Sequence, residues 1–319
     1  MKLSVIVPCY NEENNIYPFY EALVQIFKDI YFDYEIIFIN DGSKDKTLSE
    51  LKKLFSRDNE HIHIIHFSRN FGKEAALLAG LEASQGEFVS IIDADLQQNP
   101  KYIIQMLTYL EENPDCDCVA AYQDIRKEGK ILTFFKDCFY NLINKMTEIE
   151  IVRSASDFRT LRRNVVDAII SLPERCRFSK GIFSWVGFNT YYMPYTVEDR
   201  ASGESKWSFW KLFAYALDGI IAFSTTPLVI ASILGVILCF VAFILIFVIV
   251  IKTLVWGDPV AGFPTLATLI LLSAGVQLLF IGILGQYLAK SYTESKHRPV
   301  YIVKEHIKKE KTSHDIINK

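Results

Sequence analysis

The sequence lacks the glycine motifs of the commonest nucleotide-binding folds. It has no Gly-x-Gly-x-x-Gly turn and no Walker loop, which argues against a dinucleotide site and against ATP hydrolysis. It also lacks a basic excess, because 34 Lys and Arg residues face 37 Asp and Glu residues, for a formal charge of −3. Without a global basic field, nucleic acid is not an expected partner.

Cysteine is sparse and carries no zinc-ligand spacing. The six cysteines are Cys9, Cys116, Cys118, Cys138, Cys176 and Cys239. Scattered free thiols fit a cytosolic catalytic domain. The N-terminus lacks the pattern of a signal peptide, since Met1 and Lys2 lead directly into a strand-like run.

Strand and helix patterns alternate along the first 122 residues. Apolar strand-like runs are predicted at 3–8, 34–40, 61–67, 88–92 and 118–122, and helices at 13–28, 46–55, 73–83 and 100–112. This alternation predicts an α/β domain with a doubly wound, mostly parallel sheet. Residues 129–146 look helical and amphipathic. The region from there to about residue 200 is mixed, with a strand-like stretch around 190–197.

Charge is absent from two long stretches near the C-terminus. Residues 219–251 and 259–289 contain no Asp, Glu, Lys or Arg. Each exceeds the roughly 20 apolar residues that span a bilayer, so we expect an antiparallel pair of transmembrane helices. Two buried core helices of a soluble domain are the weaker alternative, because both runs are long and uncharged.

The flanking residues predict how these helices are oriented. Lys206 and Lys211 precede the first, and Lys290, Lys296, Arg298 and Lys304 follow the second. The positive-inside rule then places the large domain and both termini of this multi-pass chain in the cytoplasm. The predicted organisation is a catalytic domain at 1–204, an interfacial amphipathic helix at 205–222, a hairpin at 223–290 and a cytoplasmic tail at 291–319. The tail is expected to fray after about Val303.

The strongest chemical signal is a strand that ends in two acids, Asp93 and Asp95. Ligands of open α/β sheets collect at the carboxyl ends of strands, and two acids there repel each other unless a cation lies between them. Mg²⁺ or Mn²⁺ held by carboxylates and substrate phosphates is the ordinary solution. A solvated loop is the alternative, because Asp-x-Asp by itself is common.

Four ordered motifs carry a family resemblance. They are Pro8-Cys9-Tyr10-Asn11-Glu12, Asn40-Asp41-Gly42-Ser43, Ser68-Arg69-Asn70-Phe71-Gly72-Lys73-Glu74 and Asp93-Ala94-Asp95-Leu96-Gln97. With the apolar hairpin that follows, the chain resembles a family 2 glycosyltransferase of the polyprenyl-phosphate type, such as the bactoprenol glucosyltransferases and dolichyl-phosphate mannose synthases. The resemblance implies a GT-A fold, a nucleotide-sugar donor, a divalent metal and a polyprenyl-phosphate acceptor.

The resemblance also implies roles for the donor side of the site. Nucleotide-sugar binding would involve Pro8, Tyr10, Glu12, Asp41, Lys73 and Asp93. Asp41 would accept a hydrogen bond from a pyrimidine base such as uracil, although Asp41-Gly42-Ser43 alone fits a simple tight turn. Asp95 and Gln97 would bind the metal, Mg²⁺ or Mn²⁺. Lys73 would lie near the diphosphate, and a surface lysine at a helix start is the alternative.

The candidate catalytic residues by resemblance are Asp157 and Asp93, and Asp157 is the candidate base. A phosphate monoester has its second pKa near about 6, so the acceptor oxygen is already largely ionised. Asp157 would then orient the acceptor or stabilise positive charge at the anomeric carbon. A helix cap, or an ion pair with Arg159 or Arg162, is the structural alternative.

Candidate residues for the acceptor phosphate follow from the same resemblance. They are Arg126, Arg200, Ser205 and Lys206, since the planar guanidinium suits phosphate. Any one arginine alone is more simply a solvated surface charge. Many relatives carry a further arginine near the position of Tyr122 or Gln123, and this chain has none there.

These inferences predict an inverting transferase that moves a hexose, with glucose expected, from a UDP-sugar to undecaprenyl phosphate. The resemblance implies that the reaction takes place on the cytoplasmic leaflet of a bacterial inner (plasma) membrane. UDP-N-acetylglucosamine, another UDP-sugar or GDP-mannose are alternative donors, and a non-enzymatic membrane scaffold is the alternative outside enzymology. A processive synthase is disfavoured, because the chain has no Gln-x-x-Arg-Trp motif. A homo-oligomer such as a tetramer is expected by resemblance only.

Overall fold

A computed structural model describes residues 2–28, 32–123, 155–196, 221, 224–256 and 262–309. These residues fall into two compact units. The first contains the α/β domain and the C-terminal residues 298–309, and the second contains the long helices between them. The predicted interfacial helix and the amphipathic stretch at 129–146 lie outside the described residues.

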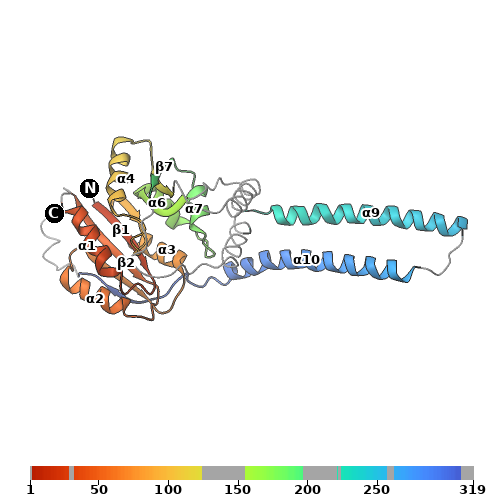
Figure 1. Cartoon of the computed structure of the whole chain (residues 1–319), viewed down its shortest axis with the longest axis horizontal. Helices are drawn as coiled ribbons and strands as arrows, with labels where there is room; N and C mark the ends of the chain where they lie inside the picture. Colours follow the sequence, from red (N-terminus) through yellow and green to blue (C-terminus); the bar gives the residue numbers. More distant parts are fainter. Residues whose placement is uncertain are drawn as a thin grey trace. The chain divides into compact units, whose positions relative to one another are not determined.

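The first unit is built on one eight-stranded sheet of order β7-β5-β6-β4-β1-β2-β3-β8 (Figure 1). Its strands are β1 (Lys2–Cys9), β2 (Asp33–Asn40), β3 (Ile62–Phe67), β4 (Phe88–Ile91), β5 (Cys118–Gln123), β6 (Ala155–Arg162), β7 (Thr190–Tyr195) and β8 (Val303–Ile307). Strands β4, β1, β2 and β3 are parallel neighbours, whereas β6 and β8 run antiparallel to β4 and β3. The expected α/β domain with a mostly parallel central sheet is confirmed.

Helices cover both faces of this sheet. They are α1 (Ile16–Phe27), α2 (Thr47–Arg57), α3 (Lys73–Ala83), α4 (Lys101–Glu112), α6 (Arg163–Ser171) and α7 (Ser179–Trp185). Because successive strand residues point to opposite faces, Val5 and Val7 of β1 pack in one core with α1 and α4, and Ile6 faces α3. Helix α3 approaches so closely that a Cβ on Gly80 would lie 2.3 Å from Ile6 Cγ2. Burial on both faces explains why these strands read as continuous apolar runs.

One strand of the first unit was not anticipated, and one expectation was wrong. Residues 155–162, predicted only as mixed structure, form strand β6, which pairs with both β4 and β5. The tail, expected to fray after about Val303, instead forms β8 and pairs with β3 from Ile64 to Phe67. Neither strand has enough apolar residues to be recognised locally, because each gains its stability from hydrogen bonds to a distant segment.

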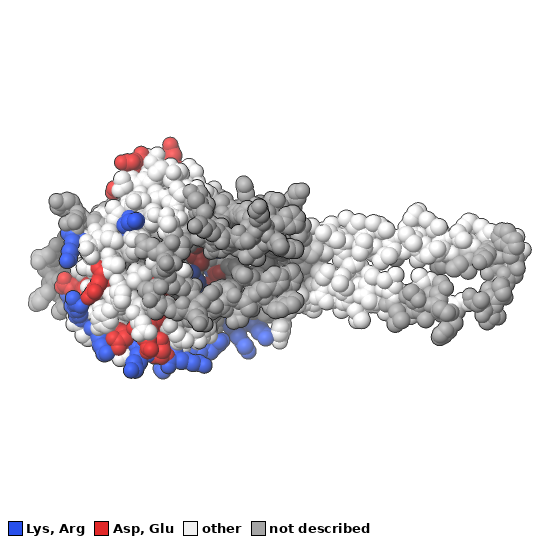
Figure 2. All heavy atoms as spheres, in the orientation of Figure 1, with Lys and Arg blue, Asp and Glu red and all other residues white. Residues whose placement is uncertain are grey.

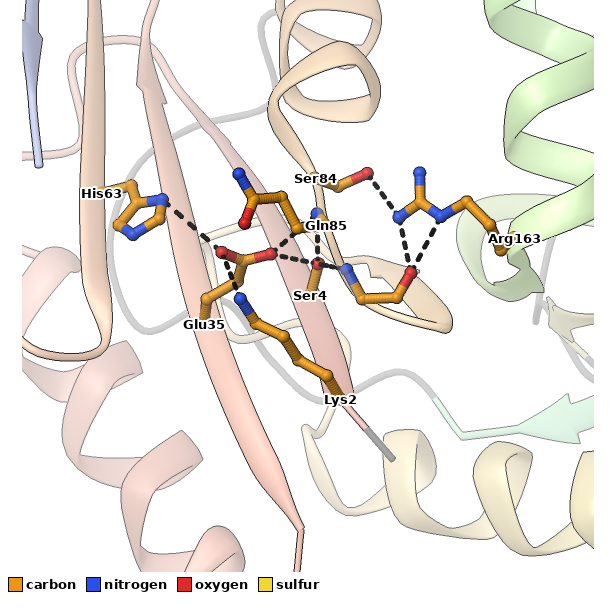
Figure 3. Close-up of polar contacts among 8 residues, drawn as sticks. Lys2, Ser4, Glu35, His63, Ser84, Gln85 and Arg163 are labelled. Atoms are coloured by element: carbon orange, nitrogen blue, oxygen red, sulfur yellow. Dashed lines mark hydrogen bonds and ion pairs between the residues drawn. The ribbon is translucent and has the colours of Figure 1, made fainter. Parts of the chain in front are cut away.

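A buried polar cluster, which we call the Glu35 cluster, lies at the amino ends of the central strands (Figure 3). Glu35 is only 2% exposed, and its carboxylate accepts hydrogen bonds from Ser4 Oγ (2.5 Å), Gln85 N (2.8 Å) and Lys2 Nζ (3.2 Å). His63 Nδ1 lies 3.6 Å from the same carboxylate. Burial would raise the pKa of Glu35, but these donors outweigh it and lower the pKa below its usual value.

The second unit holds two long helices, α9 (Thr226–Trp256) and α10 (Phe263–Ser295), which lie side by side in Figure 1. Tyr287 Oη of α10 donates a hydrogen bond to the backbone oxygen of Ser224, just before α9 (2.6 Å). Both contain stretches long and apolar enough to cross a membrane, at Thr226–Leu245 and Leu272–Ser295. Where the structure describes burial in these stretches, no residue is buried, which distinguishes them from the core helices of a soluble protein. Figure 2 shows their described atoms almost free of charged groups.

Candidate active site

The predicted site residues gather at the carboxyl edge of the sheet, where neighbouring strands β4, β1 and β2 end. Asp41 follows β2, while Asp93 and Asp95 follow β4. Asp157 arrives from β6, which pairs antiparallel with β4 so that Ile91 faces Arg159. Continuing this register by two residues brings Asp157 opposite Asp93. The strand that sequence patterns did not predict is therefore the element that delivers the candidate catalytic acid.

Lys73 joins these two acids, and we call the three residues the Lys73 cluster. Its Nζ lies 2.7 Å from Asp93 Oδ1 and 2.9 Å from Asp157 Oδ2. The side chains keep part of their surface exposed, 42% for Lys73, 30% for Asp93 and 20% for Asp157. Asp157 lies in a strand and so is not a helix cap, and it forms its ion pair with Lys73. Of the two arginines named as alternative partners, Arg159 contributes to the lowered pKa of Asp157, but less than Lys73 does.

Charge sharing fixes the protonation of the Lys73 cluster. Burial would lower the pKa of Lys73, but Asp157 and then Asp93 more than offset it, so the pKa rises above its usual value. Burial would likewise raise the pKa of Asp157, yet Lys73 and then Lys180 hold it well below the usual range. At neutral pH Lys73 is therefore protonated and Asp157 ionised, and the side chains of the cluster keep surface that a ligand can reach.

Asp41 organises the loop that precedes α3. It is 3% exposed and accepts hydrogen bonds from the backbone N–H groups of Phe71 (2.6 Å) and Gly72 (2.9 Å). Burial raises its pKa, although the two N–H donors oppose the shift. Gly42 has φ +60°, and a Cβ there would lie 2.3 Å from the backbone of Arg69. The Asp-Gly pair is therefore more than a simple tight turn, because it lets two loops approach closely.

Hydrogen bonds join the loops that follow β1 and β2, and they hold the other candidate nucleotide-binding residues in place. Asn11, with φ +55°, donates its backbone N–H to Ser43 Oγ (3.0 Å), and its side chain accepts from Lys44 N (2.9 Å). Glu12 N donates to Thr47 Oγ1 (2.9 Å). Pro8, Tyr10 and Glu12 are half-buried along this pair of loops. The structure thus brings Pro8, Tyr10, Glu12 and Asp41 to the same sheet edge as the Lys73 cluster.

The metal candidates lie on the turn after β4. Asp95 Oδ1 accepts from Gln97 N (3.1 Å), and Leu96 between them has φ +59°. Among the described residues, no group of three or more His, Cys, Asp or Glu side chains could hold a metal ion. Asp95 and Gln97 are still the oxygen donors that Mg²⁺ and Mn²⁺ prefer, and such ions often take their remaining ligands from water and substrate phosphate. The residues present fit a metal that is completed by its substrate.

Gln98 fastens this turn to the strand of Asp157. Its side chain is buried; Oε1 accepts from Asp93 N (3.2 Å) and Nε2 donates to Ser156 Oγ (3.0 Å). Ser156 Oγ also accepts from Phe158 N (3.2 Å). Gln98 therefore helps fix the positions of Asp93 and Asp157 relative to each other. The sequence did not predict this role, although Gln98 directly follows the predicted metal ligand Gln97.

A second link brings helix α7 to the site. Glu74, next to Lys73, accepts hydrogen bonds from Ser179 N (2.8 Å) and Ser179 Oγ, and the following residue is Lys180. The charge of Lys180 contributes to the lowered pKa of Asp157. Nothing in the local sequence around Ser179 and Lys180 signals this role, because it arises from packing between segments 105 residues apart.

The acceptor candidates Arg126, Arg200, Ser205 and Lys206 all lie outside the described residues. Their assignment to the acceptor phosphate stays a prediction.

The chain is similar to known proteins over nearly its whole length. The family model Glycosyl transferase family 2 matches residues 4–170. A bactoprenol glucosyl transferase of Shigella phage SfV is 41% identical over 95% of this chain and 98% of its own length. A prophage bactoprenol glucosyl transferase homolog of Escherichia coli is 39% identical over 95% and 99%.

A solved structure shows a weaker likeness. Glucosyl-3-phosphoglycerate synthase from Mycobacterium tuberculosis, in complex with Mn²⁺, uridine diphosphate and phosphoglyceric acid, is 18% identical, covers 69% of this chain and 76% of its own, and has a TM-score of 0.49. The family model covers the residues at the carboxyl ends of the strands, including Asp41, Lys73, Asp93 and Asp157. By its family model and by its relatives, the chain belongs to glycosyl transferase family 2.

Proposed function

We propose that this enzyme transfers glucose from UDP-glucose to undecaprenyl phosphate, with inversion, at the cytoplasmic face of a bacterial membrane. The observation that carries the proposal is the match to proteins named bactoprenol glucosyl transferase, which extends over 95% of the chain and so includes both apolar helices. A soluble transferase would need only the first unit.

The exposed helices support a lipid acceptor. Side chains such as Val236 (71% exposed), Phe243 (69%) and Leu278 (69%) face outward from α9 and α10. Apolar surface of this extent needs a nonpolar surrounding, and a bilayer supplies it at a length that suits the helices. The chain enters the second unit from the first and then returns to the first. An even number of bilayer crossings, such as the two proposed here, agrees with this path.

On the donor side, Asp41 is proposed to receive the nucleobase. Each carboxylate oxygen already accepts one backbone N–H and has a second lone pair available. A uracil N–H is a suitable donor to it. Pro8, Tyr10 and Glu12 would line the nucleoside, and Lys73 would be available to the diphosphate beside Asp93.

Asp95 and Gln97 would hold Mg²⁺ or Mn²⁺ together with the diphosphate. Such an ion, when bound, would stabilise negative charge on the leaving diphosphate. The chain's own contribution is to orient these oxygens, because Gln97 N bonds to Asp95 and Gln98 fixes the same turn to β6.

The Lys73 cluster suggests how the chain assists the reaction. A phosphate acceptor is already largely ionised, so it has little need of a base. Asp157, with a strongly lowered pKa, is a weak proton acceptor at neutral pH. We therefore assign Asp157 an electrostatic role, stabilising positive charge at the anomeric carbon while the acceptor oxygen attacks. Lys180, together with the predicted Arg126, Arg200, Ser205 and Lys206, would attract the acceptor phosphate.

The test uses the full-length enzyme in liposomes that contain undecaprenyl phosphate and Mn²⁺. Radiolabelled UDP-glucose, UDP-N-acetylglucosamine, another UDP-sugar and GDP-mannose are supplied in turn, and label in extracted lipid is counted. UDP-glucose should label the lipid most efficiently. A different preferred sugar would overturn the donor assignment, and no labelled lipid from any donor would overturn the chemistry.

The variant Asp95→Asn distinguishes the enzyme hypothesis from the alternative of a non-enzymatic membrane scaffold. We expect lipid labelling to fall about 100-fold, with membrane insertion unchanged. Asp167→Asn is the matched control, because Asp167 is 64% exposed on α6 and its carboxylate lies 3.7 Å from Arg163, four residues earlier on the same helix. Full labelling by Asp95→Asn, or equal loss in both variants, would contradict the metal assignment.

A further inference from the structure

After the second unit, the chain returns to the first unit and pairs with strand β3, next to the loop of residues 68–72 that contacts Asp41. Residues 298–309, which we call the return segment, follow α10 and carry β8. Arg298 O accepts from Arg175 Nε (2.7 Å), and Ile302 O accepts from Ser68 N (3.0 Å). The second of these bonds falls on the first residue after β3, where the loop leading to Gly72 begins.

Tyr301 connects the two elements that flank this loop. Its ring stacks on Phe67, the last residue of β3, with centroids 4.9 Å apart and planes 18° apart. Its hydroxyl donates a hydrogen bond to Glu82 of α3. Burial, and then Glu82, raise the pKa of Tyr301, so the hydroxyl keeps its proton. Tyr301 thus joins the end of β3 to the helix that starts at Lys73.

Packed rings extend this connection to the site. The Phe67 ring makes an edge-to-face contact with the Phe71 ring, with centroids 5.8 Å apart and planes at 88°. The Arg69 guanidinium lies over the same Phe71 ring, 4.1 Å from its centroid. Phe71 N in turn donates to Asp41. Three aromatic rings therefore form an unbroken path from the return segment to the carboxylate that is proposed to bind the nucleobase.

We propose that Tyr301 is a positioning residue for the donor nucleotide. By holding Phe67 and α3, it fixes the loop of residues 68–72, whose N–H groups hold Asp41 in place. The inference rests on the proposed role of Asp41.

The experiment measures donor binding separately from turnover in the full-length enzyme. Tyr301→Ala removes the ring, Tyr301→Phe keeps the ring but not the hydroxyl, and Glu305→Ala breaks only the exposed β8 ion pair with Lys52 (2.8 Å). We expect Tyr301→Ala to raise the Kd of UDP and the KM of UDP-glucose about tenfold, with a smaller change in kcat. Tyr301→Phe should largely restore donor affinity, and Glu305→Ala should match the parent enzyme.

Hydrogen exchange supplies a readout at the loop itself. In Tyr301→Ala the amides of Phe71 and Gly72 should exchange faster, while Gly86 N, bonded to Ser4 Oγ at the opposite edge, should be unaffected. If Tyr301→Ala does not fold, Phe71→Leu breaks the same path without altering the return segment. It should likewise raise the KM of UDP-glucose more than it lowers kcat.

The inference is overturned if Tyr301→Ala, or in its place Phe71→Leu, binds UDP as the parent does. It is also overturned if Glu305→Ala loses donor affinity to the same extent as Tyr301→Ala. Asp41→Asn distinguishes a failure of the underlying proposal. If this variant binds UDP normally, the role of Asp41 is wrong, whereas weak binding by Asp41→Asn and normal binding by Tyr301→Ala would refute the positioning role alone.

Discussion

Each end of the sheet carries a cluster of carboxylate and lysine side chains, and the two clusters are built differently. In the Glu35 cluster the carboxylate is 2% exposed, and a hydroxyl, a backbone N–H and one lysine satisfy it. In the Lys73 cluster one ammonium is shared by two carboxylates, and all three side chains keep accessible surface. One cluster is closed by fixed donors and the other is balanced mainly by charge.

We propose that this difference separates a structural cluster, that of Glu35, from a functional one, that of Lys73. Fixed dipoles around Glu35 join β1, β2 and the loop before β4, and they leave no place for a ligand. A charge pair that is partly exposed can instead exchange partners when an anionic ligand arrives. The position of the two clusters agrees, because ligands of α/β sheets bind at the carboxyl edge and the Glu35 cluster occupies the amino edge.

The variant Asp157→Asn is expected to have the largest effect, and it is the most direct test of the difference between the two clusters. The variant should lower kcat for glucosyl transfer by about 10²- to 10³-fold, because it removes the negative charge beside the reacting carbon. Single-turnover labelling of undecaprenyl phosphate measures it, with Asp167→Asn as the exposed control. A kcat close to that of the parent enzyme would show that Asp157 is structural, as Glu35 is.

Lys73→Met tests whether charge balance controls the site. Asp93 and Asp157 would then face each other without a cation, so the pKa of Asp157 should rise from its lowered value. In the parent enzyme Asp157 stays ionised until the pH falls through that low pKa, so it adds no acid limb near neutrality. In the variant the acid limb of the kcat/KM profile should move up in pH, with activity at pH 7 reduced about tenfold or more.

Lys73→Arg keeps the positive charge and should leave the acid limb where it is in the parent. An unshifted profile in Lys73→Met would contradict the electrostatic account of the cluster.

Glu35→Gln should affect stability and leave catalysis unchanged. Replacing the carboxylate puts an amide N–H₂ near Lys2 and weakens a buried network, at a cost of about 1–3 kcal/mol, or several degrees in Tm. The pKa of Glu35 is lowered, so its contribution is present above the unfolded-state pKa of about 4.3 and is lost as the pH falls through the folded-state pKa. The Tm difference between parent and variant should therefore shrink in acid.

Glu21→Gln is the matched control for that measurement, since the Glu21–Arg57 pair is long (3.9 Å) and both side chains are more than 60% exposed. A large loss of glucosyl transfer in Glu35→Gln, at a temperature where it stays folded, would remove the distinction between the two clusters.

Much of the first unit could be predicted from local patterns. Strands β1 to β5 and helices α1 to α4 appear within a few residues of their predicted positions, because their apolar runs are buried on both faces and need no distant partner to be recognised. Strand β6 could not be predicted, since Ser156, Asp157 and Arg159 are polar and the strand exists through its pairing with β4 and β5. The same holds for β8, whose Lys304 and Glu305 looked like a solvated tail.

The sequence alone determined the α/β class, the two long apolar helices and the residue types at the carboxyl edge, because these depend on short-range periodicity and on motifs of a few residues. Only the tertiary structure decided which groups meet. It brought Lys73 between Asp93 and Asp157, tied Glu74 to Ser179 and placed Tyr301 on Phe67. Each of these contacts joins segments that are remote along the chain, and their geometry follows from sheet register and packing, which no local pattern encodes.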